Sequence, residues 1–319
     1  MKRNGGIDFM RSAMMFCIIL LHILEGEQFW PDYRRLVFVL MVSVDAFVFI
    51  SGYYSVRFSW GKLARLYGTT FLCLGILWTS RVLPTSVSVV EAFKGLWFLH
   101  CYAFLMCFAP LINRAFETEV SLLNRLKFFA PILCLVFFWG PLSHMLFFHH
   151  FVPEVPGLAA RTGLTLVGVY IVARFYRLYE SRFDRIPLWA YALLGLMFLS
   201  IDAVGMFWFG DNDSPSSVLA ALCLFHLFKN MRLPSFLGKM SCFVAPSVFS
   251  VYLLHVNDPM MELLRTLASK IDQSIGCVLA ACAGAALCCF AVSIGIDLAR
   301  RGVITSCQRV LRSSNGDSV

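Results

Sequence analysis

The chain has 319 residues, of which 59% are hydrophobic and 14% are charged, and its formal net charge is +8. A typical soluble domain has about 25% charged residues, so this composition excludes an ordinary soluble enzyme and indicates a polytopic membrane protein. A basic balance can also indicate nucleic-acid binding, but here the distribution of Lys and Arg explains it without a nucleic-acid partner.

Ten hydrophobic segments follow one another with short connections, and most approach the length of about 20 residues that crosses a bilayer as a helix. Segment 214–229 is the weakest, because its apolar part, Val218 to Phe228, is short for a full span. If this segment enters and leaves the membrane on the same side, the number of spans that follow it changes. We therefore expect one all-α integral-membrane domain, residues 1–319, built as a bundle of about ten transmembrane helices. The segments cover residues 7–26, 36–56, 63–83, 94–113, 127–148, 160–177, 187–209, 214–229, 243–266 and 274–298.

The positive charges predict the orientation of this bundle. An even number of spans leaves both termini on one side, and Lys and Arg concentrate in cytoplasmic loops. With the N-terminus inside, 20 of the 27 Lys and Arg residues are cytoplasmic. This bias predicts an N-in/C-in protein with a short cytoplasmic tail, residues 299–319. The seven basic residues outside are Arg34, Arg35, Arg81, Lys94, Arg161, Arg265 and Lys270.

The first hydrophobic segment carries two ionisable residues, Arg11 and His22, in an otherwise lipid-like stretch. Eleven positions at about 100° each amount to three turns plus roughly 20°, so both side chains lie on one stripe of the helix. The rise of about 1.5 Å per residue separates them by roughly 16 Å. Ionisable groups at such depth usually face the protein interior or a wet cavity, and they are candidates for function.

Four stretches of the chain follow one another: IDFMR with His22, VDAFVFISGYY, GLWFLHCYAFLMCFAPLIN and LGKMSCFVAPSVFSVYLLH. In this order they resemble the acyltransferase 3 family of membrane-bound enzymes. IDFMR followed by ten residues and His22 is similar to the family's Arg-x10-His signature. VDAFVFISGYY resembles its aromatic-rich second helix ending in Ser-Gly, and GLWFLHCYAFLMCFAPLIN resembles its Leu-Trp-Phe helix. LGKMSCFVAPSVFSVYLLH resembles its Gly-Lys-x-Ser stretch leading into Tyr-Leu-x-His. CFVAP makes this last stretch longer than the usual form, so we do not carry the family's serine over to Ser241.

The resemblance implies O-acylation of surface glycans in the bacterial inner membrane. The co-substrate would be acyl-coenzyme A, with acetyl the expected group, and no cofactor would be permanently bound. The acceptor would be a glycan or a lipid-linked saccharide, with membrane lipids around the bundle. An imidazole that titrates near neutral pH suits removal of the acceptor's hydroxyl proton, so His22 is the expected base. The alternative is a hydrogen-bonded core histidine.

Three further candidates accompany His22. Arg11 at the cytoplasmic end could bind donor phosphates, and it could equally anchor the helix by pairing with Asp8 one turn earlier. Asp45 lies mid-helix, where a carboxylate needs a partner, protonation or a shared cavity, and we favour its orienting a histidine. Tyr252 and His255 differ by three positions and share a helix face, as an acceptor or supporting site or as structural residues.

No metal site is expected, because the histidine cluster His144, His149 and His150 lacks the i, i+4 spacing typical of helix-borne ligands. Ser51 and Gly52 are best explained by close helix packing. The donor's acyl group must reach His22 across the membrane, either on an extended pantetheine arm or through an acyl-histidine relay. The rival function is a secondary transporter or polysaccharide exporter that uses Arg11, Asp45 and His22 as a proton or substrate pathway. A non-catalytic scaffold is the weaker alternative.

Overall fold

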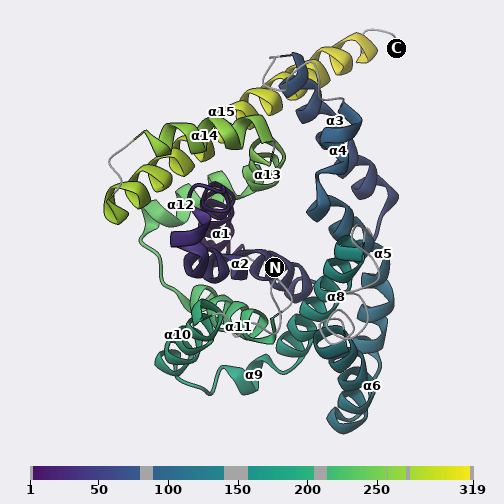
Figure 1. The fold of residues 1–319 in the computed structure, drawn as a ribbon. Coiled ribbons are helices and arrows are strands. Elements are labelled where there is room, and N and C mark those ends of the chain that lie inside the picture. The colour runs from purple at the N-terminus through teal and green to yellow at the C-terminus, as the bar shows by residue number, and fades with distance from the viewer. Residues whose placement is uncertain are drawn as a thin grey trace.

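The computed structural model describes residues 3–79, 89–139, 157–204, 214–256, 258–270 and 274–316, and every regular element within these ranges is helical (Figure 1). The first half contains α1 (Gly5–Leu24), α2 (Trp30–Tyr53), α3 (Trp60–Thr79), α4 (Val89–Lys94), α5 (Trp97–Glu117), α6 (Leu122–Cys134) and the π-helix η1 (Leu135–Trp139). The second half contains α8 (Gly157–Leu178), α9 (Glu180–Phe183), α10 (Leu188–Val204), α11 (Pro215–Asn230), α12 (Ser235–Val244), the 3-10 turn η3 (Ala245–Ser247), α13 (Val248–His255), α14 (Asp258–Ser269) and α15 (Ile275–Gly316).

The prediction of an all-α membrane protein is confirmed. Each of the ten predicted segments overlaps a helix, and five helices of the described chain are long and apolar enough to cross a membrane. These five are Gly5–Leu24, Asp32–Tyr53, Trp97–Glu117, Ser235–His255 and Ile275–Ser306. The number of crossings and the N-in/C-in orientation stay predictions.

Helix α11, the weakest predicted span, has 16 residues. At 1.5 Å per residue it is about 24 Å long, less than the hydrocarbon core of about 30 Å.

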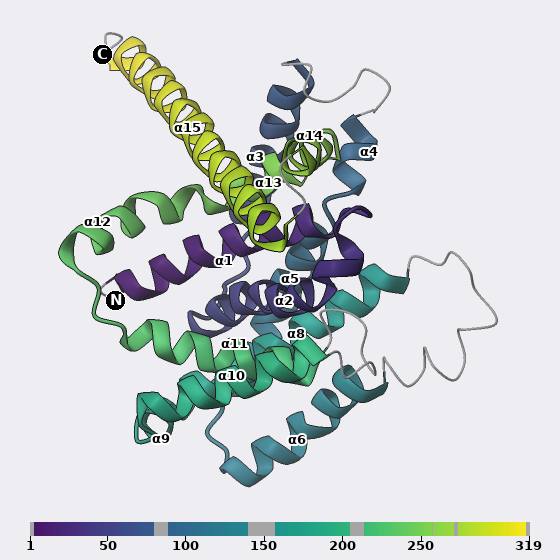
Figure 2. The same ribbon diagram turned by 60° about the vertical axis from the view of Figure 1, so that its left-hand side comes forward.

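Two boundaries differ from the prediction. Segment 243–266 is wrong as one span, because the helix that carries it begins at Ser235, ends at His255 and is followed by the separate helix α14. Pro259 fits the start of a new helix here, since proline is favoured in the first turn of a helix, where its missing N–H would have no partner. The last segment does not stop at 298 either. Helix α15 continues to Gly316 and projects beyond the other helices (Figure 2).

Helix α1 is the centre of the bundle, in contact with α2, α11, α12, α13, α14 and α15. Its N-terminus begins with Asn4, whose side-chain oxygen accepts the backbone N–H groups of Gly6 and Ile7. The Asn4 amide also donates to the carbonyl of Lys229, 3.0 Å away. At Gly6 a Cβ would lie 2.0 Å from the Phe228 carbonyl oxygen. The start of α1 is therefore packed directly against the end of α11.

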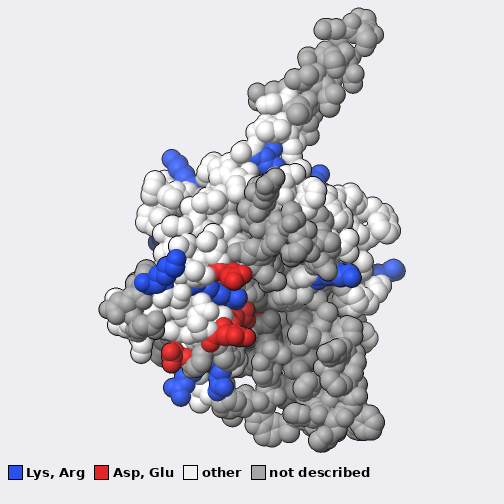
Figure 3. Space-filling view, turned by 45° about the horizontal axis from the view of Figure 1, so that its top comes forward, with Lys and Arg blue, Asp and Glu red and all other residues white. Residues whose placement is uncertain are grey.

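On the face drawn in Figure 3, the described part of the surface is largely white, with Lys and Arg at separate places and Asp and Glu gathered in one region. The exposed residues include many large hydrophobics, among them Phe236, Phe243, Trp189 and Leu196. Such a surface would be an aggregation liability in water and is expected of helices that face lipid.

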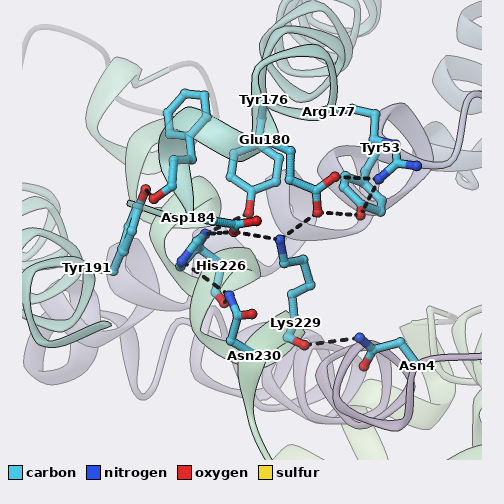
Figure 4. A network of polar contacts seen from close by, with 11 residues as sticks. Asn4, Tyr53, Tyr176, Arg177, Glu180, Asp184, Tyr191, His226, Lys229 and Asn230 are labelled. Atoms are coloured by element: carbon cyan, nitrogen blue, oxygen red, sulfur yellow. Dashed lines mark hydrogen bonds and ion pairs between the residues drawn. The ribbon is translucent and has the colours of Figure 1, made fainter. Parts of the chain in front are cut away.

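A polar network joins α2, α8, α9 and α11 near the start of α1 (Figure 4). The Lys229 ammonium lies 2.6 Å from Glu180 Oε1 and 3.0 Å from Asp184 Oδ1. The Tyr53 hydroxyl donates to Glu180 Oε1 at 2.9 Å, and Arg177 pairs with the same carboxylate. The network thus ties four elements through one carboxylate.

A second part of the network surrounds His226, which is buried in α11. Its Nδ1 lies 2.7 Å from the Tyr176 hydroxyl, and its ring stacks on Tyr191 with centroids 3.9 Å apart. Each polar atom of this ring has a neighbour, since Asn230 lies 3.2 Å from Nε2. These contacts explain His226 as a structural residue, as expected for a core histidine.

The ionisation of Glu180 favours the folded state. Burial alone would raise the pKa of its carboxyl group, but hydrogen bonds from Lys229 and Tyr53 and the charges of Lys229 and Arg177 lower the pKa below its ordinary value. A carboxyl group with a lowered pKa in the folded protein stabilises the fold above its unfolded pKa, about 4.3. That contribution is lost as the pH falls through the folded pKa.

We expect Lys229→Met to lower the midpoint of thermal unfolding of the detergent-solubilised protein at pH 7. The change leaves two carboxylates without their shared ammonium, at a cost of about 1–3 kcal/mol. The difference from the parent protein should narrow as the pH falls through the lowered pKa of Glu180, because its protonated carboxyl group no longer attracts the ammonium. Lys239→Met, at an exposed position of α12, is the control. An equal loss for both variants, or a loss independent of pH, would contradict this role.

Candidate acyl-transfer site

His22 lies in the last turn of α1 and is the partly exposed member of a histidine pair, with its side chain 22% accessible. Its Nδ1 is 3.0 Å from Glu25 Oε2. A carboxylate can only accept, so Nδ1 carries the proton and Nε2 of the neutral ring keeps its lone pair. This tautomer presents His22 Nε2 as a base, with Glu25 orienting the ring.

The second histidine is His255, the last residue of α13. Its ring lies 5.6 Å from the His22 ring, centroid to centroid, and it is completely buried. Its Nδ1 is 2.8 Å from the carbonyl of Val251, which fixes the proton on Nδ1. Nε2 has no hydrogen-bond partner among the described residues. A buried polar atom without a partner calls for a specific explanation, and a role at a functional site is one.

Tyr252 joins this pair from the same helix face, as its spacing predicts. Its ring lies 6.0 Å from His255 and 5.6 Å from Phe98 at the start of α5. The structure therefore brings His22, Tyr252 and His255 together, with Phe98 as a further wall.

Arg11 lies near the other end of α1. Its Nη1 is 3.0 Å from Asp8 Oδ1, so the predicted pairing with Asp8 is confirmed. Asp8 is buried and also accepts a hydrogen bond from Arg3. The guanidinium of Arg11 lies 5.8 Å from the ring centre of Tyr54. The Arg11 side chain nevertheless remains 34% accessible and faces a cavity, so its guanidinium can still contact a ligand.

The cavity has a volume of about 540 Å³ and is strongly basic. No Asp or Glu occurs among the described residues that line it. Its cations come from α1, the α2–α3 connection, α3 and α15: Arg11, Arg57, Lys62, Arg65 and Arg300. Aromatic and hydroxyl groups line it as well: Ser51, Tyr54, Ser55, Thr69, Tyr102, Phe249 and Ser250. This combination suits a ligand that carries several phosphates and an apolar arm.

Arg300 is held rigidly in the cavity wall. Its Nε and Nη2 lie 3.0 and 2.6 Å from Asp297 Oδ1, and Asp297 is completely buried. The Ser250 hydroxyl donates to the same oxygen at 2.6 Å, and Arg301 pairs with the other one. Because Asp297 is shared by two arginines and a serine, its charge is fully compensated.

The rim of the cavity is a turn after α2. Ser55 has φ 57°, in the left-handed region that non-glycine residues seldom adopt. Arg174 donates to the Ser55 hydroxyl, and Asn113 donates to the carbonyl of Val56 at 2.9 Å. Helices α5 and α8 therefore fix the turn that presents Arg57.

A row of rings in contact leads from the cavity to the histidine pair. Ser51 Oγ lies 3.2 Å from the Tyr102 hydroxyl, and both line the cavity. The ring centroids along the row are 5.9 Å apart for Tyr102 and Phe98, 5.6 Å for Phe98 and Tyr252, 6.0 Å for Tyr252 and His255, and 5.6 Å for His255 and His22. The two ends of α1 are thus connected by a continuous wall of side chains.

Asp45 is completely buried in α2, and its Oδ2 accepts a hydrogen bond of 2.6 Å from Ser217 of α11. Of the three possibilities given for this carboxylate, the structure shows a hydrogen-bonding partner. Its role in orienting a histidine stays a prediction, since Glu25 is the carboxylate bonded to His22 Nδ1.

Gly52 matches its packing interpretation, because a Cβ there would lie 2.6 Å from Ala173 Cβ. The chain packs α2 closely against α8 at this point.

Comparison with known protein families assigns this chain to one of them. The model of the acyltransferase 3 family, described as an acyltransferase domain, matches residues 4–296. The chain belongs to the acyltransferase 3 family. The comparisons with curated proteins and with solved structures gave no match. Membership supports acyl transfer as the reaction of this membrane protein.

Two groups of site residues in this acyltransferase 3 family member escaped the sequence analysis. Glu25 follows His22 by three positions, a spacing that brings side chains together on a helix, and could have been found. The cavity's basic residues were counted only as cytoplasmic charges, and nothing in the sequence shows that Arg300 meets Arg57 and Arg11.

Among the residues that the structure describes, no group of three His, Cys, Asp or Glu side chains could hold a metal ion. His144, His149 and His150 lie outside those residues. His100, another histidine of the chain, has its Nε2 3.1 Å from the carbonyl of Phe93, as expected for a structural role.

Diethyl pyrocarbonate should modify His22 of this family member before His255 or His226. The reagent needs an accessible imidazole nitrogen, and the side chain of His22 is 22% accessible while His255 and His226 are buried. Peptide mass spectrometry over a time course measures the order. Modification of His255 at the rate of His22 would contradict the buried position of His255.

Proposed function

We propose that the protein transfers an acyl group, with acetyl the expected one, from cytoplasmic acyl-coenzyme A to a hydroxyl of a cell-surface or lipid-linked glycan in a bacterial inner membrane. The single observation that carries the proposal is the basic cavity at the Arg11 end of α1, joined by contiguous rings to His22 at the other end. Family membership supplies the reaction class.

The donor's phosphates are proposed to bind Arg11, Arg57, Lys62, Arg65 and Arg300. Coenzyme A carries a pyrophosphate and a ribose phosphate, and guanidinium groups bind phosphate oxygens in pairs of hydrogen bonds. Five cations with no carboxylate among the described lining residues provide an excess of positive charge for such a ligand.

The pantetheine arm is proposed to run along the ring row toward His22. Arg11 and His22 lie eleven positions apart, roughly 16 Å along the helix. An extended arm that starts at the phosphates would have to bridge that distance. Tyr102, Phe98 and Tyr252 would give its apolar and amide groups a continuous surface to lie on.

The chemistry then follows from the tautomer of His22. Nε2 takes the proton of the acceptor hydroxyl as its oxygen attacks the thioester carbonyl carbon. The new C–O bond forms, the C–S bond breaks, and the protonated imidazole returns its proton to the departing thiolate. Glu25 stabilises the imidazolium between these steps. Tyr252 and His255 support the ring of His22.

The distribution of charge supports a donor site on the cytoplasmic side of the membrane. All five cavity cations belong to the set predicted to be cytoplasmic, and the basic residue beside His22, Arg265, belongs to the outer set. This separation supports the N-in/C-in arrangement, with donor inside and acceptor outside.

His22→Ala should abolish transfer of label from [14C]acetyl-coenzyme A into alkali-labile glycan material. Membrane vesicles from the producing cells, with the native gene deleted and the variant restored, provide the acceptor. His100→Gln, a histidine bonded to a backbone carbonyl away from the ring row, is the matched control. Transfer retained in His22→Ala would remove His22 from the mechanism. Binding without consumption of the thioester by the parent protein would favour a transporter.

Arg57→Gln combined with Arg65→Gln should raise KM for acetyl-coenzyme A and leave kcat nearly unchanged. Exposed charge pairs contribute about 0.2–1 kcal/mol each, so the double variant should raise KM by about two- to thirtyfold. The effect should shrink for acetyl-pantetheine, which lacks the nucleotide phosphates. Arg114→Gln with Lys127→Gln, exposed basic residues outside the cavity, is the control. An equal effect on both donors would argue against phosphate binding here.

A further inference from the structure

The last turn of α1, which carries His22, receives a guanidinium from a distant part of the chain. Arg265 of α14 donates from Nη2 to the carbonyl of His22 at 2.6 Å and from Nε to the carbonyl of Ile23 at 3.4 Å. The two contacts link residues more than 240 positions apart. They attach α14 to the end of the helix on which the proposed base is carried.

The end of a helix is a favourable place for this cation. The last carbonyls of an α-helix have no partners within the helix, and the partial negative charge there attracts a guanidinium. Gly26 leaves the space that the side chain needs, because a Cβ at this position would lie 2.8 Å from Arg265 Cδ and Nε. A larger residue at 26 would displace Arg265 from the carbonyls.

His22 is therefore held at two points. Its ring is oriented by Glu25 and its main chain by Arg265. Helix α14 follows directly on α13, which ends with His255, so one stretch of chain supplies both the ring beside His22 and the guanidinium on its carbonyl.

We propose that Arg265 is a positioning residue for His22. Its two donors hold the final turn of α1 so that the imidazole stays against Glu25 and His255 in the geometry needed for proton transfer. The inference rests on the proposed role of His22 as the base. In the alternative, Arg265 serves only as a positive charge in an outer loop, and that role needs no contact with α1.

The test is the kinetics of Arg265→Gln in membrane vesicles that contain the native acceptor. Rates are normalised to folded protein, measured by fluorescence-detected size exclusion. A small displacement of a catalytic group costs up to about 100-fold in rate, so we expect kcat to fall by roughly 10- to 100-fold. KM for acetyl-coenzyme A should stay unchanged, because the donor cavity is at the other end of α1. Lys270→Gln removes the same charge from the exposed residue directly after α14 and should leave both constants unchanged.

Two further variants separate positioning from folding. Arg265→Lys keeps the charge but can reach the carbonyls with only one ammonium group, so kcat should lie between the parent and Arg265→Gln. Gly26→Ala keeps Arg265 and crowds it, so kcat should fall by about two- to tenfold with normal KM, in line with a smaller displacement. These two variants decide the question if Arg265→Gln does not accumulate as folded protein.

Each outcome has a distinct meaning. Normal kcat in Arg265→Gln, or a raised KM with kcat unchanged, overturns the positioning role. If His22→Ala is inactive while Arg265→Gln is normal, only this inference fails. If His22→Ala is active, the proposed function itself fails, whatever Arg265 does.

Discussion

The structure depends on how helix α1 carries ionisable groups through an apolar bundle. A buried charge without compensation costs several kcal/mol, so each group on this helix needs a partner in another element or on the next turn. Asp8 is buried between Arg3 and Arg11, and His22 lies between Glu25 and His255. Arg3, Arg11 and Glu25 belong to α1 or to the residues beside it, while His255 belongs to α13. Cys242 of α12 and Arg265 of α14 add hydrogen bonds at the two ends of α1, so the last helices pack around the first where its polar groups lie.

This arrangement separates binding of the donor from the chemistry. The cations that could neutralise a phosphate ligand lie at one end of α1, and the imidazole pair lies at the other, roughly 16 Å away. A compact active site would need neither a basic cavity nor a row of aromatic contacts between the two. The ring row from Tyr102 to His255 connects the basic cavity with the histidine pair, since it forms one continuous surface between these two places.

Much of this could be predicted from local sequence, and the rest depends on long-range contacts. The stripe of Arg11 and His22 and the shared face of Tyr252 and His255 follow from helical periodicity, which acts over a few turns. Arg265 could only be read as an outer charge, because its partner carbonyls lie more than 240 residues away. Segment 243–266 was misjudged because apolar residues lie on both sides of a short polar break, at which one helix ends with His255 and α14 begins with Asp258.

Helix α13 has the key mechanical position. Ser250 near its start donates to Asp297, which holds Arg300 in the cavity wall, and His255 at its end lies against His22. Five residues of helix, about 8 Å, separate these two attachments. Because a hydrogen-bonded helix of that length barely changes its own length, α13 sets the distance between the cavity wall and the histidine pair. The ring of His255 is therefore kept beside His22 by contacts made at the donor end, which links the two halves of the site through a single short helix.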